Sequence, residues 1–277
     1  MDHVLKDITS VVNHKGGVAK TSTVLSLAGG LLRENRDLRV LVIDMDSQCN
    51  LSMLCGWEQD EKNPRPTIYD ALCVNGEGRG IPVYKSEHGY YYTPASSDLS
   101  GIELDLRKQS IPEGVLFDRL GRPIDDHTGD GLKDIYSFDY VLIDCPPELS
   151  DTTSNAIVAS SRVLIPVLLT PLAYTGLSSI IKKQTKLDVG LRRLLNGKDY
   201  EAQDICIVPT ITEANTRIAR KYFNRIQEVF GKYISKTRIR KDVKMGESQG
   251  EMTDIFHYAP YCHAAIDYEM LIKELYS

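Results

Sequence analysis

Short runs of apolar and β-branched residues alternate along this chain with longer stretches whose apolar positions recur at helical spacing. This alternation predicts an α/β fold in which a mostly parallel central β-sheet is covered by helices. Several of the runs are apolar at nearly every position, which is typical of strands buried on both faces, so we expect helices on each side of the sheet. The predicted strands are residues 8–13, 39–44, 90–94, 140–144, 163–168, 205–210 and, with a weaker pattern, 233–239.

The helical periodicity is clearest in five stretches, at residues 21–33, 150–160, 177–195, 215–230 and 264–276. We find no linker, internal repeat or low-complexity tract between them, so we expect a single domain that spans residues 1–277. Two segments rich in Pro, Gly and Asp, residues 58–65 and 121–131, are predicted to be surface loops.

The composition is that of a globular protein, with 42% hydrophobic and 26% charged residues. No apolar run approaches the roughly 20 residues of a membrane helix. The first residues also lack the basic and apolar regions of a secretory signal. We therefore expect a cytoplasmic protein. Its six cysteines form no CxxC pair and no zinc-type spacing, so we expect reduced, mostly buried thiols.

A loop of glycines and lysines joins the first predicted strand directly to the first predicted helix. Backbone N–H groups at such a helix N-terminus favour a bound anion. Lys20 is expected to reach the β- and γ-phosphates of a nucleotide, and the Thr21 hydroxyl to bind Mg²⁺. The strict GxxxxGK[ST] pattern is not met, because His14 and Ala19 occupy its glycine positions. The residues expected to bind the nucleotide are Lys15, Gly16, Gly17, Val18, Ala19, Lys20, Thr21 and Ser22.

Residues 15–21 resemble the deviant Walker A motif of the ParA/MinD family of P-loop ATPases. Residues 40–50 resemble that family's second strand with its DxDxQxN switch, and residues 139–147 resemble its Walker B segment. The resemblance covers essentially the whole chain. It is strongest to short ParA proteins without an N-terminal helix-turn-helix domain, because the first predicted strand starts within ten residues of Met1. It implies a P-loop NTPase fold, ATP and Mg²⁺ as cofactors, and hydrolysis of ATP to ADP and phosphate.

The resemblance also implies roles for individual charged residues. Asp144, at the end of an apolar strand, is expected at the Mg²⁺ ion, with Asp44 close to the metal as well. Asp46 would orient the attacking water, and strand alternation separates it from Asp44 unless the chain has already turned into a loop. Lys15 would cross to the phosphates of a second subunit and act like an arginine finger, whereas Lys20 would contact the phosphates within its own subunit. Hydrolysis would then require an ATP-dependent homodimer.

Three further segments carry expectations from the same resemblance. Residues 147–153 resemble the second switch, which links the γ-phosphate to the dimer face. By position, residues 210–213 and the loop 240–243 should surround the adenine, although the family's Pro-Arg pair is replaced by Arg240-Lys241. Ala19 stands where glycine is commoner, and its methyl group is tolerated if φ is negative.

Positive charge is concentrated towards the C-terminus, although the net charge of the chain is −5. Residues 214–245 hold ten bases and two acids, and residues 182–198 hold six bases and one acid. Such a run is often only a solvated helix face, but it is also large enough to contact a polyanion. Together with the resemblance, it favours non-specific DNA binding. The side chains expected to contact DNA are Arg217, Arg220, Lys221, Arg240 and Lys244.

These expectations favour a DNA-partition ATPase that is associated with the nucleoid and stimulated by a ParB-like partner. Membrane positioning, as in MinD, is disfavoured because acidic residues in the last predicted helix do not suit a lipid surface. Transfer of electrons or metal clusters, as in relatives of the nitrogenase iron protein, needs paired cysteines, and Cys145 has no second cysteine at short spacing. Positioning of a protein cargo and a slowly hydrolysing nucleotide switch remain open.

Overall fold

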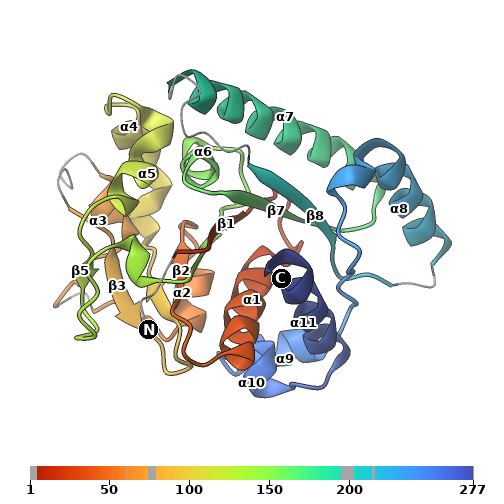
Figure 1. Cartoon of the computed structure of the whole chain (residues 1–277), viewed down its shortest axis with the longest axis horizontal. Helices are drawn as coiled ribbons and strands as arrows, with labels where there is room; N and C mark the ends of the chain where they lie inside the picture. The colour runs from red at the N-terminus through yellow and green to blue at the C-terminus, as the bar shows by residue number, and fades with distance from the viewer. Residues whose placement is uncertain (1–4, 61, 74–78, 195–202, 214–215, 277) are drawn as a thin grey trace.

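Eight strands in the described part of the chain form one central sheet (Figure 1). This computed structural model describes residues 5–60, 62–73, 79–194, 203–213 and 216–276. The strands are β1 (Asp7–Val11), β2 (Val40–Asp44), β3 (Pro82–Lys85), β4 (Tyr91–Thr93), β5 (Asp125–Asp126), β6 (Tyr140–Asp144), β7 (Arg162–Val167) and β8 (Asp204–Pro209). Their order is β5-β3-β4-β2-β6-β1-β7-β8, and every pair is parallel except β3 with β4.

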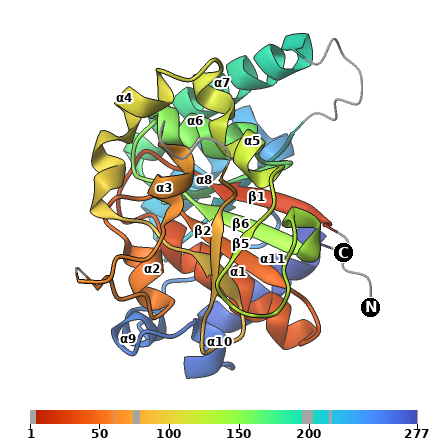
Figure 2. The same ribbon diagram turned by 90° about the vertical axis from the view of Figure 1, so that its left-hand side faces the viewer.

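Helices cover both faces of this sheet (Figures 1 and 2). One face is covered by α1 (Lys20–Glu34), α2 (Asn50–Leu54), α9 (Lys244–Gly250), α10 (Ile255–Tyr258) and α11 (His263–Tyr276). The other is covered by α3 (Ile68–Leu72), α4 (Ile102–Leu106), α5 (Val115–Leu120), α6 (Asp151–Val158), α7 (Pro171–Leu194) and α8 (Arg217–Phe230). The sheet therefore lies between two hydrophobic layers.

The central strand β2 shows how the sequence produces these layers. Val40 and Val42 pack into the core beneath α1 and α11, whereas Leu41 and Ile43 pack into the core beneath α6 and α7. All four side chains are fully buried, because successive residues of a strand point to opposite faces. This arrangement confirms the predicted α/β fold with a mostly parallel sheet and helices on both faces.

Helix α1 lies unusually close to the C-terminal helices. A Cβ atom at Gly29 would clash with the Asp254 carboxylate, and one at Gly30 would clash with Ile272 and Phe256. The two glycines therefore allow α10 and α11 to approach the α1 backbone directly. The Tyr268 hydroxyl of α11 also lies 3.0 Å from the Thr23 hydroxyl of α1, so the contact is polar as well as apolar.

Six of the seven predicted strands are present within one or two residues of their expected ends, but residues 233–239 are not a strand. They follow the 3₁₀ turn Gly231–Tyr233 and form an isolated bridge from Ile234 to Ile207. Single backbone hydrogen bonds to β8 come from Ser235, to Ile207, and from Ile239, to Pro209. The backbone N–H groups of Lys236 and Thr237 bond instead to the Glu274 carboxylate, at 2.6 and 2.9 Å. A side chain of α11 thus interrupts the expected strand pairing.

The sequence analysis also missed the edge of the sheet. Residues 121–131 were expected to be only a surface loop, yet they contribute the two-residue strand β5, which pairs with β3. The Asp126 carboxylate then accepts backbone N–H groups from Thr128, Gly131 and Leu132 at 2.9–3.0 Å. These bonds fold the segment into a tight turn, which a composition rich in Gly and Asp does not distinguish from an open loop.

Candidate functional site

The loop between β1 and α1 lies at the carboxyl edge of the sheet, where β1 runs between β6 and β7. Asn13 fixes the start of the loop: its amide group donates to the Pro166 carbonyl at 2.7 Å and accepts the Lys15 N–H at 3.0 Å. Asn13 is buried, so these two hydrogen bonds, which connect the loop to β7, are protected from water. The sequence analysis did not identify Asn13, although its place at the end of an apolar strand was a usable signal.

Two residues of the loop adopt the left-handed conformation. Gly17 has φ +70°, and Ala19, which caps the N-terminus of α1, has φ +71° and ψ +34°. The condition under which the Ala19 methyl group would be tolerated without strain, a negative φ, is therefore not met. The backbone turns left-handed here to begin α1, and alternation of this kind curves successive N–H groups into an anion-binding nest. The alanine methyl group is accommodated at a cost in backbone strain.

Thr21 and Asp144 meet at the centre of the site. The Thr21 hydroxyl donates to Asp144 Oδ2 at 2.6 Å, because Asp144 ends the strand β6 that pairs with β1. The other carboxylate oxygen, Oδ1, is buried and has no hydrogen-bond partner within the described residues. Burial, and then the negative charge of Asp44, raise the pKa of Asp144 well above its ordinary value. A hydroxyl beside an unsatisfied, crowded carboxylate fits a divalent cation such as Mg²⁺.

Asp44 lies beside Asp144, but both of its carboxylate oxygens accept hydrogen bonds from the segment that follows β2. Asp44 Oδ1 accepts the Asp46 N–H at 3.0 Å, and its Oδ2 accepts both the N–H and the hydroxyl of Ser52, at 2.9 and 2.7 Å. The carboxylate is buried, and burial raises its pKa. Asp44 therefore anchors the loop that follows β2, and its expected position close to the metal stays a prediction. Ser52, which also accepts the Ala95 N–H at 2.8 Å, was not identified from the sequence.

Asp46 lies in this loop, after the chain has turned away from the strand. Strand alternation therefore does not separate it from Asp44. Asp46 Oδ1 accepts the Gln48 N–H at 3.0 Å. After burial and the charge of Asp44, the negative charge of Asp46 also raises the pKa of Asp144. A hollow of about 490 Å³ beside Asp46 is lined by both switch segments, including Pro147. The structure thus brings the three predicted carboxylates together at one edge of the sheet.

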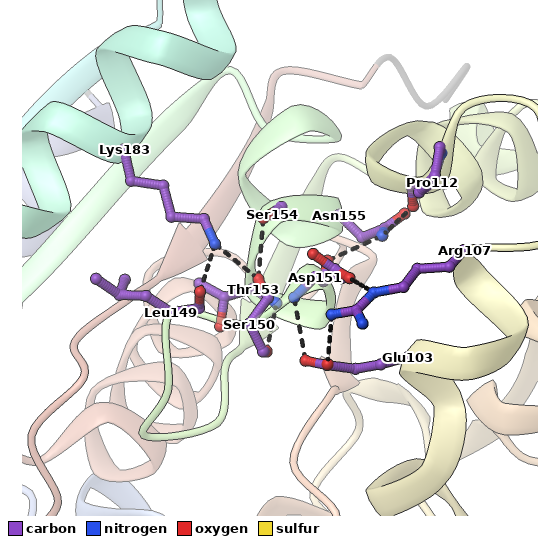
Figure 3. Close-up of polar contacts among 10 residues, drawn as sticks. All are labelled: Glu103, Arg107, Pro112, Leu149, Ser150, Asp151, Thr153, Ser154, Asn155 and Lys183. Carbon is purple, nitrogen blue, oxygen red and sulfur yellow. Dashed lines mark hydrogen bonds and ion pairs between the residues drawn. The ribbon is translucent and has the colours of Figure 1, made fainter.

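The segment that follows Asp144 is held by side chains from two neighbouring helices (Figure 3). Ser150 caps α6 by accepting the Thr153 N–H at 3.3 Å. Lys183 of α7 donates to backbone carbonyls on one side, and Arg107 of α4 pairs with Asp151 on the other. Neither the link from α7 nor the link from α4 was expected from the sequence.

The two segments expected around the adenine do lie side by side. The Thr212 N–H donates to the Ile239 carbonyl at 2.9 Å, and the Lys241 N–H donates to the Thr212 carbonyl at 3.2 Å. The Thr210 hydroxyl donates to the Val18 carbonyl of the phosphate loop at 2.9 Å. This juxtaposition agrees with the expected position, while contacts to a base stay a prediction.

The basic residues expected to contact DNA fall into two groups. Arg217, Arg220 and Lys221 are exposed on α8. Arg240 is instead paired with the buried carboxylate of Asp267, through Nη2 at 2.7 Å and Nε at 2.9 Å, and its backbone N–H bonds to the same group. Lys244 pairs with Glu247 at 2.6 Å. Of the five candidates, the three on α8 are the ones best placed to meet a polyanion.

Two expectations about chemistry elsewhere in the chain have clear outcomes. All six cysteines are free thiols, and four of them are buried. Within the ranges that the structure describes, no helix combines the length and the apolar character that a bilayer crossing requires.

A family model described as an AAA domain matches residues 6–196 of the chain. The chromosome partitioning protein ParA of Myxococcus xanthus is 32% identical over 241 residues, which cover 87% of this chain and 77% of that protein. The chromosome-partitioning ATPase Soj of Treponema pallidum is 30% identical, with 95% and 94% covered. A solved structure of cobyrinic acid a,c-diamide synthase from Mycobacterium smegmatis, with bound ATP analogue and magnesium, has a TM-score of 0.72 at 24% identity and covers 97% of this chain and 93% of that one. The last similarity is one of fold alone.

Proposed function

The chain belongs to the ParA/MinD family of P-loop ATPases, and from that premise we propose that it is a DNA-partition ATPase. An ATP-bound homodimer binds DNA without sequence preference, and a ParB-like partner stimulates hydrolysis and release. One observation carries the proposal: the same domain holds a nucleotide-type site and an exposed basic helix. The site is the Thr21–Asp144 pair beside the lysine-rich phosphate loop, and the helix is α8. The protein would then be found in the cytoplasm, on the nucleoid.

The proposed nucleotide site uses the residues already placed around the phosphate loop. Backbone N–H groups of residues 16–19 and the N-terminus of α1 receive the phosphates, and Lys20 neutralises them from within the same subunit. Thr21 and Asp144 would hold Mg²⁺, which when bound offsets charge on the β- and γ-phosphate oxygens. The M. smegmatis structure, which holds an ATP analogue and magnesium on this fold, supports ATP as the nucleotide.

Hydrolysis requires a group that orients water and a positive charge that meets the transition state. Asp46 supplies the first, because it lies in a loop fixed by Asp44 close to Asp144. Its carboxylate accepts a hydrogen bond from the attacking water and directs the lone pair of that water at the γ-phosphorus. Lys15 supplies the second by reaching the phosphates of the other subunit, which makes turnover depend on dimerisation.

DNA binding is assigned to the exposed face of α8. Arg217, Arg220 and Lys221 share this face and can neutralise phosphates without reading bases. If these three side chains act in each subunit of a dimer, the logarithm of the affinity falls with the logarithm of salt with a slope of about −5. Arg240 and Lys244 contribute less, because each already has a carboxylate partner.

A MinD-like membrane role fits the last helix poorly. Tyr268, Leu271 and Ile272 of α11 are buried within the fold, and Asp267 and Glu274 bind neighbouring backbone N–H groups. An amphipathic helix that lies on a membrane needs its apolar face available to lipid. Most apolar side chains of α11 are already packed within the fold, mainly against α1, and only two of them, Ile266 and Met270, are exposed among the described residues of this helix.

Binding to random-sequence duplex DNA with ATP, ADP or no nucleotide, across a salt series, tests the proposal. We expect tight binding only with ATP, a steep salt dependence, and a weakening of at least tenfold in Arg220→Glu with ATP affinity unchanged. Lys133→Glu is the matched control, because Lys133 is exposed near the β5 edge of the sheet, opposite the edge beside α8. Failure to bind DNA in every nucleotide state would reject the partition role and favour positioning of a protein cargo.

A further inference from the structure

Lys183, near the middle of α7, reaches out of its helix to the segment that follows the Walker B strand. Its Nζ atom donates to the Leu149 carbonyl at 2.5 Å and to the Ser150 carbonyl at 2.9 Å (Figure 3). The side chain is half-buried, and burial lowers its pKa. Withdrawing an ammonium group from water is costly unless hydrogen bonds compensate, so these two bonds are a specific link between α7 and this segment.

The same segment is held on its other side by α4. The Arg107 guanidinium pairs with Asp151 at 2.9 Å and with Glu103 at 3.1 Å, and Glu103 also accepts the Asp151 N–H at 3.4 Å. Arg107 is 61% exposed, so this pairing is screened by water and contributes little on its own. Lys183 is the more buried of the two attachments and therefore the stronger candidate to transmit a displacement.

Helix α7 continues from this link towards basic surface. The neighbouring Lys182 and Lys186 are exposed, and α7 packs against α8, which presents Arg217 and Arg220. The segment that Lys183 contacts begins directly after Asp144, and Asp144 is hydrogen-bonded to Thr21 of the phosphate loop. One side chain thus bridges the nucleotide edge of the sheet and the helix pair that carries exposed positive charge.

We propose that Lys183 is a positioning residue that couples the second switch to the basic face formed by α7 and α8. This inference rests on the proposed function, because it supplies the route by which nucleotide state alters DNA affinity. A ligand shifts a conformational equilibrium only through contacts that differ between the two states. When ATP displaces residues 148–150, the two carbonyls either carry the Lys183 ammonium with them or release it, and α7 changes position relative to DNA.

The test compares DNA affinity with ATP and with ADP in three variants. Wild type is expected to show an ATP preference of about 5- to 150-fold, the usual range of allosteric coupling. In Lys183→Met the preference falls to about twofold or less, while ATP affinity is unchanged because the phosphate loop is untouched. Lys183→Arg, whose forked donors can serve two carbonyls, retains the preference. Lys133→Met removes an exposed lysine charge near the opposite edge of the sheet, away from both the switch and the basic face, and it also retains the preference.

The outcomes separate this inference from the proposed function. No ATP preference in wild type overturns both. An ATP preference that survives in Lys183→Met overturns only the role of Lys183. Hydrogen–deuterium exchange of wild type provides a reading that does not depend on any variant folding. ATP must change exchange in α7 around Lys183 together with exchange in residues 148–153, and a response confined to residues 148–153 also overturns the inference.

Discussion

Replacing Ala19 with glycine should stabilise this protein, although glycine at most helix positions does the opposite. Ala19 has φ +71° and ψ +34° at the N-cap of α1. The left-handed conformation costs an L-residue about 1–2 kcal/mol. Glycine avoids that cost, but it also increases the conformational entropy of the unfolded chain, which lowers the free energy of unfolding by about 0.4–1 kcal/mol. The net gain in the free energy of unfolding for Ala19→Gly is therefore about 0.5–1 kcal/mol, which raises Tm by about 1–4 °C for a domain of this size.

Urea and thermal unfolding of the nucleotide-free protein measure this change. Ala219→Gly is the matched control, since Ala219 is a buried residue inside the regular helix α8. It should lose about 1 kcal/mol from helix propensity and somewhat more from the lost methyl burial. Ala19→Val provides the opposite perturbation at the same site, because a β-branched side chain tolerates positive φ poorly, and it should lose more than 1 kcal/mol.

The strain explanation makes the sign of the Ala19→Gly effect decisive. Equal destabilisation of Ala19→Gly and Ala219→Gly would show that the loop is not strained at Ala19 and that the methyl group contributes useful packing. A rise in stability confined to Ala19→Gly would show that the chain carries strain at the base of its phosphate loop.

Three further perturbations probe other parts of the site and the fold. Lys20→Ala should abolish nucleotide binding, measured with a fluorescent ATP analogue. Asp46→Ala should still bind ATP, lower the rate of ATP hydrolysis by about 10²-fold or more and lengthen the residence time on DNA, and loss of DNA binding in both variants would reject the role of Asp46. Ser52→Ala should lower the free energy of unfolding by about 1–3 kcal/mol, because the Ser52 hydroxyl is a buried partner of both Asp44 Oδ2 and the Ala95 N–H. Ser47→Ala, in the same loop, is the control, and equal losses in the two variants would mean that the hydrogen bond from Ser52 to Asp44 is unimportant. The hydrogen bond that His257 Nδ1 donates to Asp254 raises the pKa of His257 above 6.5. The charged pair therefore stabilises the fold at pH 6.5 and below, and this contribution is lost as pH rises through the raised value. His257→Gln should flatten that part of the stability profile in pH-dependent melts, and an unchanged profile would assign the dependence to another group.

The sequence predicted the parts of the site that depend on local order. Lys15 to Ser22 follow an apolar strand and open a helix, and Asp144 ends another apolar strand, so their place at one edge of a parallel sheet follows from adjacency along the chain. Pairing of β1 with β6 then brings Thr21 to Asp144. Parallel strands with both faces buried left few other arrangements.

What the sequence did not predict depends on contacts between distant residues. Glu274 accepts the N–H groups of Lys236 and Thr237, which reduces an expected strand to a bridge. Asp267 pairs with Arg240, and this ion pair was not expected from the sequence. Lys183 meets Leu149 only in three dimensions. The sign of φ at Ala19 is likewise set by the path of the whole loop, and not by the residue.

The glycines of α1 bear on where this molecule can move. Gly29 and Gly30 let α10 and α11 pack directly on the α1 backbone. We therefore expect this side of the sheet to be rigid and to hold the phosphate loop in a fixed position. Nucleotide-driven motion is then expected on the opposite side of the sheet, through the loop after β6 and through α7. A fluorescent probe attached to α11 should stay silent during the ATP cycle, whereas one on α7 should report it.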